Sequence, residues 1–216
     1  MKIVAVVPIK LTSRRLPQKN IKPFTNGKPL SFYIFNTLLA VDYIDEVYVY
    51  CSDEKIKKYI PENVIFKQRS KSLDTDTTSM NEVLKAFSKE VPADIYVMTH
   101  ATSPFVSPDS ITRGLKSVIS GDFDSAFAVK KIQDFLWKNN KPINYTLDRI
   151  PRTQDLEPIY EETSGFYIFN QEILTKFERR IGNKPFMVEV SEIEAIDIDE
   201  EIDFIIADSI FNFLMN

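Results

Sequence analysis

Short apolar runs alternate with amphipathic helical segments through the first 129 residues, and this alternation limits the fold more than any other feature of the chain. The runs rich in β-branched and aromatic residues, which predict buried strands, are residues 3–8, 47–50, 64–66, 95–98 and 125–129. The segments whose apolar side chains recur at helical spacing lie between them, at 30–41, 54–59, 79–87 and 107–119. Strands joined by helices predict right-handed crossovers, and therefore a three-layer α/β fold with a mostly parallel sheet and helices on both faces.

The pattern changes near residue 130. Residues 131–162 are rich in Lys, Asn and Pro with scattered aromatic side chains, and we expect a small excursion from the sheet there. The elements expected beyond it are a strand at 165–169, a helix from about Asn170 and a strand near 186–190. A last helix is predicted from Glu200, and its apolar side chains, expected to face the core, are Ile202, Ile205, Ile206, Ile210, Phe213 and Leu214.

The composition is that of an ordinary soluble globular protein, with 44% hydrophobic and 27% charged residues. No linker-like segment divides the 216 residues, so we expect a single domain over 1–216. The net charge of −4 argues against general attraction to nucleic acid or to anionic membranes, so any cluster of cations must act locally. The lone Cys51 excludes an internal disulfide and favours a cytoplasmic location, and no apolar run reaches membrane-spanning length.

A loop with four cations follows the first predicted strand directly. Lys10, Arg14, Arg15 and Lys19 stand within ten residues of each other, and a loop after a buried strand offers backbone N–H groups as well as side-chain charges. Such an arrangement suits a polyphosphate, although a solvated basic loop is the ordinary alternative. The loop contains no Gly and is not a Walker A sequence.

Two carboxylates near the end of the chain alternate with two isoleucines in the run Ile196-Asp197-Ile198-Asp199. If this run is a short strand, Asp197 and Asp199 point to the same side. Two carboxylate ligands, completed by substrate phosphate and water, suit Mg²⁺. The alternative is an acidic strand end that caps the last helix and is favoured by the helix dipole.

Two further polar segments are expected at the edge where parallel strands end and ligands bind. The first, residues 99–104, contains His100, the only histidine, together with Thr102 and Ser103. His100 is a candidate catalytic base, but a lone histidine at a strand end is more often structural or a binding donor. The second segment runs from Asp74 to Ser79 and either contacts a nucleotide or caps the following helix; the spacing of Ser79 and Glu82 fits a capping box.

These segments together resemble the acylneuraminate cytidylyltransferase family, the CMP-sialic-acid synthetases and relatives that act on other acidic sugars. The opening loop resembles the family's Pro-Ala-Arg-Gly-Gly-Ser-Lys-Arg-Leu-Pro-Gly-Lys-Asn and is identical to it at Pro8, Ser13, Arg15, Leu16, Pro17, Lys19 and Asn20. The later segments that resemble family motifs, in the same order, are Asp76-Thr77 with Ser79, Ala101-Thr102-Ser103-Pro104, 151–156, 164–168 and 196–199. Each string is short, but the combination is specific and spans most of the chain.

The chain also departs from the family pattern. The family's first Arg is Lys10 here, which still offers a point charge to a phosphate, and its three glycines are Leu11, Thr12 and Gln18. Glycine permits close approach and a positive φ, so these changes bear on how the loop wraps a phosphate. The family's sugar-contacting Gln is replaced by His100, which leaves the identity of the acceptor open.

The resemblance implies a Rossmann-like nucleotidyltransferase fold and a Mg²⁺-dependent reaction. The hydroxyl of an acidic 2-keto sugar attacks the α-phosphate of CTP, pyrophosphate leaves, and the CMP-sugar serves surface polysaccharide or glycan synthesis. The roles carried over residue by residue are phosphate neutralisation by Lys10, Arg14 and Lys19; nucleoside contact by Asn20, Arg69 and Ser79; metal binding by Asp197 and Asp199; sugar carboxylate binding by Arg152; and an acceptor wall of His100, Thr102, Ser103 and Tyr167.

The resemblance also implies a homodimer in which the excursion at 131–162 reaches the partner's site. Phe135, Trp137 and Tyr145 fit an interface, and equally fit local packing. Two alternatives stay open for the function. One is the same transfer to KDO, pseudaminic acid, legionaminic acid or a small phosphorylated compound, and the other is a non-catalytic nucleotide-binding relative.

Overall fold

The structure, a computed structural model, describes residues 1–13 and 15–215, and in this part of the chain a seven-stranded sheet forms the centre of the molecule. Its strand order is β3-β2-β1-β4-β8-β5-β9. The strands are β1 (Ile3–Ile9), β2 (Glu46–Cys51), β3 (Val64–Gln68), β4 (Ile95–Thr99), β5 (Ser125–Ile132), β8 (Ile159–Asn170) and β9 (Pro185–Glu189). Only the pairings of β8, with β4 and with β5, are antiparallel among these strands, so the expected mostly parallel sheet is confirmed.

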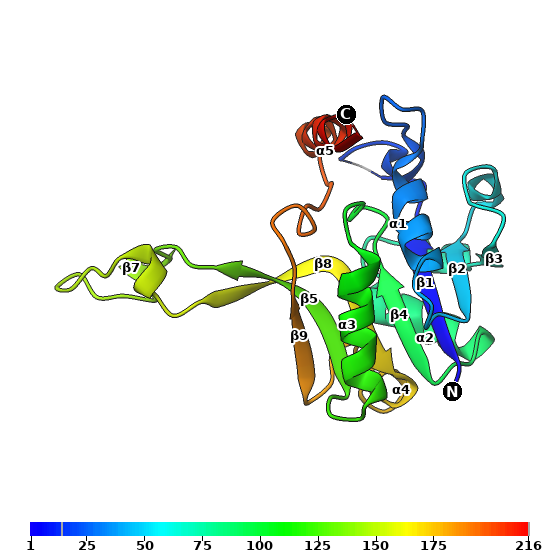
Figure 1. Cartoon of the computed structure of the whole chain (residues 1–216). Coiled ribbons are helices and arrows are strands. Elements are labelled where there is room, and N and C mark those ends of the chain that lie inside the picture. The colour runs from blue at the N-terminus through cyan, green and yellow to red at the C-terminus, as the bar shows by residue number, and fades with distance from the viewer. Residues whose placement is uncertain (14, 216) are drawn as a thin grey trace.

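The helices cover both faces of this sheet, as the alternation predicts (Figure 1). They are α1 (Leu30–Leu39), α2 (Met80–Glu90), α3 (Pro108–Ile119), α4 (Gln171–Phe177) and α5 (Glu201–Met215), and the segment expected as a helix at 54–59 is a 3₁₀ turn over Glu54–Lys58. Helix α2 begins with the predicted capping box, because Ser79 and Glu82 bind each other's backbone N–H groups.

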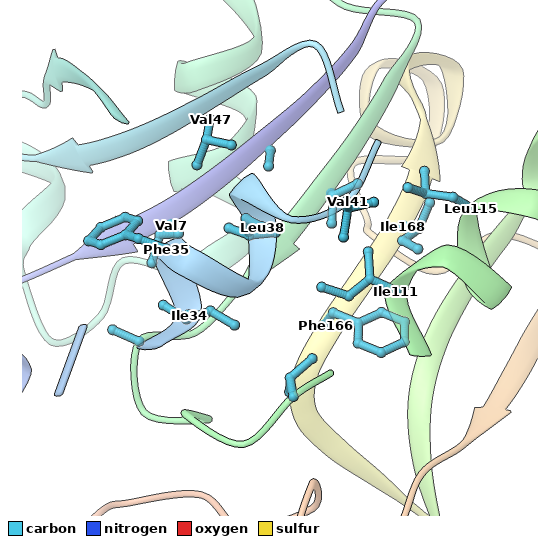
Figure 2. Packing of buried hydrophobic residues seen from close by; sticks show 14 of the residues in the cluster. Val7, Ile34, Phe35, Leu38, Val41, Val47, Ile111, Leu115, Phe166 and Ile168 are labelled. Carbon is cyan, nitrogen blue, oxygen red and sulfur yellow. The ribbon is translucent and has the colours of Figure 1, made fainter. Parts of the chain in front are cut away.

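Two apolar cores lie on opposite faces of the sheet. On one face α1 and α3 bury Phe35, Leu38 and Ile111 against β-strand side chains that include Val7 and Phe166 (Figure 2). The other face is covered by α2 and α4, whose buried residues are Val83, Leu84, Phe87, Ile173 and Leu174. Because both faces are covered, strands such as β1 are buried at every position, which explains why they read as continuous apolar runs.

The excursion is shorter at its base than expected. Residues 131–132 and 159–162 belong to β5 and β8, which continue as an antiparallel pair with Ile132 opposite Ile159. The part outside the seven-stranded sheet is 133–158, an arm that projects from the body and carries a small hairpin of β6 (Trp137–Lys138) and β7 (Lys141–Pro142) (Figure 1). Long antiparallel strands thus support the arm at its base.

Helix α5 lies beyond the carboxyl ends of the strands rather than on one of the faces of the sheet (Figure 1). The expected inward face is wrong, because Ile202, Ile205, Ile206, Phe213 and Leu214 are all about half exposed or more. The residues that pack inward are Phe204, Ala207 and Phe211, which contact Leu16, Phe24, Leu30, Tyr33 and Phe105. This helix is apolar nearly all round, so its periodicity does not indicate which face is buried. Aromatic contacts with distant residues determine the buried face.

None of the helices among the described residues is long and apolar enough to cross a membrane.

Candidate active site

A polar cavity of about 410 Å³ opens at the carboxyl ends of β1 and β4. The strands that follow β1 and β4 in the sheet lie on opposite sides of this pair, so the cavity occupies the point where the strand order reverses, as ligand sites in open α/β sheets do. Its lining residues are Pro8, Lys10, Thr12, Ser13, Arg15, Lys19, Asn20, His100, Ala101, Thr102, Ser164, Asp197 and Asp199. The cation loop, the 99–104 segment and the acidic pair, far apart in the sequence, therefore meet in one site.

The acidic pair lies on a connection without regular secondary structure, so the expected strand at 196–199 is not formed. Its position comes from Ile198, whose side chain is fully buried beside Leu16 and Phe204. The Ile198 N–H donates to the carbonyl of Thr102 at 2.8 Å, and its carbonyl accepts from Lys19 Nζ at 2.9 Å. The expectation that both carboxylates face the same way is nevertheless confirmed, because both line the cavity.

Asp199 is held by two cations of the loop. Lys19 Nζ lies 3.0 Å from its Oδ1, and Arg15 Nη1 lies 2.7 Å from its Oδ2. Burial alone would raise the pKa of Asp199, but the hydrogen bond and charge of Lys19, reinforced by Arg15, hold that pKa below its usual value. Asp199 is therefore an anion at neutral pH.

The pKa of Asp197 is shifted in the opposite direction to that of Asp199. Burial is the main reason why its pKa is raised, and the charge of Asp199 adds to the effect, while a hydrogen bond from Thr102 opposes it. Its Oδ1 atom is buried without a hydrogen-bond partner, which is costly unless something else satisfies it. A divalent cation between the two carboxylates would supply that partner.

The donor set suits Mg²⁺ in particular. Among the described residues there is no group of three or more His, Cys, Asp or Glu side chains that could hold a metal. Mg²⁺ commonly takes one or two carboxylates and completes its shell with water and substrate phosphates. Asp197 and Asp199 in a polyphosphate-sized cavity match that pattern.

The cation loop is fixed from within. Asn20 is buried, and its Nδ2 donates to the carbonyl of Lys10 at 3.1 Å, while its Oδ1 is buried without a partner. Lys10 Nζ reaches Asp76 Oδ1 at 3.4 Å. Arg14, expected to neutralise phosphate, lies outside the described residues. Asn20 thus ties the loop to the backbone of Lys10 and leaves one buried acceptor without a partner.

The loop keeps a backbone shape that suits glycine although it contains none. Gln18, which replaces a family glycine, has φ 55° and ψ 23°, the left-handed region. The turn expected of glycine is therefore retained, and Gln18 bears the strain of adopting it.

Arg69 and Ser79, which were expected to contact the nucleoside, bind other groups of the protein instead. Arg69 is 4% exposed, and its Nε and Nη2 donate to Asp74 Oδ1 at 3.1 and 2.6 Å. Ser79 is engaged in the capping box. Neither residue lines the main cavity or the adjoining cavity of about 320 Å³, whose lining residues are Lys10, Thr12, Ser13, Asp74, Thr75 and Asp76.

Of the expected acceptor residues, His100 and Thr102 line the main cavity, whereas Ser103 and Tyr167 are buried behind it. Arg152 lies on the arm, exposed, and makes a bidentate ion pair with Asp155 at 2.8 and 2.9 Å. The binding of the sugar carboxylate by Arg152 remains a prediction. The cavity also contains Ser164, which was not assigned a site role from the sequence although it stands within a motif that carries the resemblance.

His100 is neutral in this site. Desolvation, followed by the nearby charges of Arg180 and Lys19, lowers its pKa to about 4, with Asp199 opposing the shift. A base this weak accepts a proton poorly at neutral pH, so the geometry favours a binding role over general-base catalysis.

The sequence profile of the family described as Cytidylyltransferase matches residues 4–207. The chain belongs to this family. It is 26% identical over 216 residues to N-acylneuraminate cytidylyltransferase A of Danio rerio, covering 95% of this chain and 50% of that one. It is 27% identical over 183 residues to the pseudaminic acid cytidylyltransferase of Campylobacter jejuni, covering 77% and 78% of the two chains. The chain thus spans about half the length of the N-acylneuraminate relatives it matches.

The fold is also that of a solved structure. A CMP:2-keto-3-deoxy-manno-octonic acid synthetase complexed with CTP superimposes with a TM-score of 0.74 over 99% of this chain and 100% of that chain, at 16% identity. At this identity the likeness establishes the α/β nucleotidyltransferase fold and leaves the roles of individual residues to the geometry described above.

Replacement of Gln18 by Gly tests the strained turn. Gly removes a left-handed penalty of about 1–2 kcal/mol and adds about 0.5–1 kcal/mol of backbone entropy loss, so the free energy of unfolding should be unchanged or rise by about 1 kcal/mol. The matched control is Ala40→Gly, at an exposed position with φ −89°, which should lose about 0.5–1 kcal/mol. Urea unfolding measures both, and equal losses would contradict a strained Gln18.

Replacement of His100 by Gln tests the neutral imidazole. Between the ordinary pKa of 6.5 and the folded value of about 4, the unfolded chain binds a proton that the folded chain does not. The contribution of His100 to stability is therefore present above pH 6.5 and lost as the pH falls toward 4. The urea midpoint should fall between pH 7 and pH 5, and this fall should be smaller for His100→Gln than for the wild type. Identical falls in the two proteins would show that His100 titrates normally.

Proposed function

We propose that this protein transfers CMP from CTP to an acidic 2-keto sugar, with Mg²⁺ as cofactor and release of pyrophosphate. The observation that carries the proposal is the convergence of Lys10, Arg15 and Lys19 with Asp197 and Asp199 in a single cavity at the sheet edge. Membership of the cytidylyltransferase family and the names of the relatives, which act on N-acylneuraminate and pseudaminic acid, support the donor and the class of acceptor.

The reaction exchanges one phosphorus–oxygen bond for another. The acceptor hydroxyl oxygen bonds to the α-phosphorus, the bond to the β-phosphate oxygen breaks, and the hydroxyl proton leaves to solvent. Asp197 and Asp199 would hold Mg²⁺, which would supply positive charge against the phosphate oxygens. Positioning and charge stabilisation are the main demands of such a transfer, so the absence of a strong base among the described cavity residues is compatible with it.

The residues of the chain divide this work by position. Lys10 and Lys19, on the cation loop, bind the phosphates, and Asn20, which lines the same cavity, lies near the nucleoside. His100 and Thr102, on the segment that follows β4, form the opposite wall, where the acceptor binds. The neutral imidazole of His100 can donate or accept a hydrogen bond with a sugar hydroxyl.

Assembly as a homodimer is part of the proposal. The arm exposes Ile143, Leu147 and Ile150, which favours contact with another molecule. Phe135 and Trp137 pack partly on Tyr145, at ring distances of 4.9 and 6.2 Å, so these aromatics also hold the arm together.

Pyrophosphate release tests the proposal directly. The purified protein is incubated with Mg²⁺, each of the four ribonucleoside triphosphates, and N-acetylneuraminate, pseudaminate or KDO in turn. We expect release only with CTP and with at least one of these sugar acids. Release that does not depend on any acceptor, or silence with all of them, would contradict the proposal.

The metal pair is tested by Asp199→Asn. We expect turnover to fall at least about 100-fold, because metal-held charge contributes several kcal/mol to the transition state. The urea midpoint should change little, since the ion pairs of Asp199 are partly exposed. Asp208→Asn, the same substitution on α5 at a residue that binds Thr25 outside the cavity, is the matched control. Turnover by Asp199→Asn at the control's level would remove the metal assignment.

A further inference from the structure

Asp203 stands in the first turn of α5, shortly after the acidic pair. Its Oδ2 accepts a hydrogen bond from the N–H of Glu200 at 2.7 Å and another from the N–H of Asp199 at 3.0 Å. The first bond, from the residue that precedes the helix to the third residue of the helix, is an ordinary contact of a helix N-terminus. The second bond reaches one residue further and ties the helix to a carboxylate of the proposed metal pair.

The peptide group between Ile198 and Asp199 is therefore held at both ends. Its N–H donates to Asp203, and its carbonyl accepts from Lys19 Nζ at 2.9 Å. The N–H of Ile198 donates to the carbonyl of Thr102 at 2.8 Å, which fixes the preceding peptide group as well. Because a rotation of this backbone would break several hydrogen bonds at once, the direction in which the Asp199 side chain leaves the backbone is set.

Helix α5 gives Asp203 a fixed support. Phe204, the next residue, is buried beside Leu16 of the cation loop. One turn further along, Asp208 accepts from the N–H and the hydroxyl of Thr25, at 3.0 and 2.5 Å. Both contacts join α5 to the N-terminal part of the chain, so the carboxylate of Asp203 keeps its position relative to the cation loop.

Asp203 is not itself a member of the metal-binding set. It does not line the cavity that contains Asp197 and Asp199. In the part of the chain that the structure describes, no three acidic, His or Cys side chains form a group that could hold a metal. An effect of Asp203 on the metal pair therefore passes through the backbone of Asp199.

The contact with Asp203 differs from the side-chain contacts of Asp199. Lys19 and Arg15, which pair with the Asp199 carboxylate at 3.0 and 2.7 Å, are cations and also attract a polyphosphate. If they turn to the phosphates, they release Asp199. The hydrogen bond from the Asp199 N–H to Asp203 lies outside this exchange, so it would still orient Asp199 when CTP is bound.

We propose that Asp203 positions the carboxylate of Asp199 for metal binding by holding the Asp199 N–H. This inference rests on the proposed function, since it concerns the metal pair of the same reaction. A carboxylate that is already oriented loses less freedom when it binds a cation, and an ionised acceptor makes stronger hydrogen bonds than a neutral one. Asp203 is thus a positioning residue, whose loss weakens metal binding although both carboxylate ligands remain.

Metal binding is measured with Mn²⁺ as the probe, from the relaxation of water protons in the presence of the protein and CTP, without an acceptor. For Asp203→Ala we expect the Kd of Mn²⁺ to rise about 10-fold, as is typical when a residue that orients a metal ligand is lost. The Kd of CTP, measured by calorimetry with EDTA, should stay constant. Asp203→Asn keeps an acceptor oxygen for the two N–H groups and should restore most of the affinity for Mn²⁺.

The matched control is Asp208→Ala, which removes from the same helix another carboxylate that accepts a backbone N–H. Ala is the best helix former, so both Ala variants should fold, and urea midpoints measure what each loses. The control should bind Mn²⁺ as the wild type does. If it binds Mn²⁺ as weakly as Asp203→Ala, the effect comes from the docking of α5 and the proposal is overturned. Asp203→Asn with the weak binding of Asp203→Ala would assign the effect to charge and would overturn it too.

Turnover separates this inference from the proposed function. With CTP and an acceptor that supports pyrophosphate release, the Mg²⁺ concentration that gives half of the maximal rate should rise about 10-fold in Asp203→Ala, while the KM for the acceptor stays constant. Unchanged Mg²⁺ and Mn²⁺ dependence with normal pyrophosphate release overturns the positioning role and retains the transfer. Weaker Mn²⁺ binding by Asp203→Ala, in a protein that releases no pyrophosphate with any acceptor, retains the positioning role and rejects the transfer. A wild type that binds no Mn²⁺ in the presence of CTP overturns both.

Discussion

The burial of Ile198 is the contact on which the site depends. Its side chain lies between Leu16 of the cation loop and Phe204 of α5, and its backbone binds Thr102 on one side and Lys19 on the other. One residue thus joins three segments that are separated by about 80 to 180 positions in the sequence. The two aspartates flank it and inherit its position, so the apolar contact fixes where the carboxylates stand. An acidic pair built this way does not need a strand to keep its geometry.

Charge balance explains the remainder of the site. The protein as a whole is acidic, with a net charge of −4, yet the cavity gathers Lys10, Arg15 and Lys19 beside two carboxylates. Asp199 uses both Lys19 and Arg15 as partners, and the two cations keep it ionised. A polyphosphate brings its own negative charge to these cations, and a metal brings positive charge to the carboxylates. If both bind as proposed, ligand and metal together would replace the internal pairs, and the binding of each would favour the binding of the other.

The elements that could be predicted from the sequence are those decided by local chemistry. The strands buried on both faces read as apolar runs, and the capping box of α2 follows from Ser79 and Glu82 alone. The face of α5 could not be predicted, because a helix apolar all round takes its orientation from Phe24 and Tyr33, more than 170 positions away. In the site, the order of the motifs correctly predicted that the acidic pair and the cation loop lie together. The prediction of a strand at 196–199 was wrong, because alternating Ile and Asp residues also fit a connection that is anchored at one residue.

The acceptor wall is the part that motifs describe least, for a physical reason. In the proposed reaction the phosphate and metal groups are the same for every acceptor, so a loop and an acidic pair recur as strings that can be recognised. The wall is instead assembled from side chains whose neighbours are set by tertiary contacts. His100 and Thr102 stand in it because the N–H of Ile198, more than 90 positions later, donates to the carbonyl of Thr102 and brings the acidic pair beside them. No spacing within the segment announces such a contact. A change of acceptor within this fold therefore requires few substitutions, at positions that surround the reacting groups without belonging to their motifs.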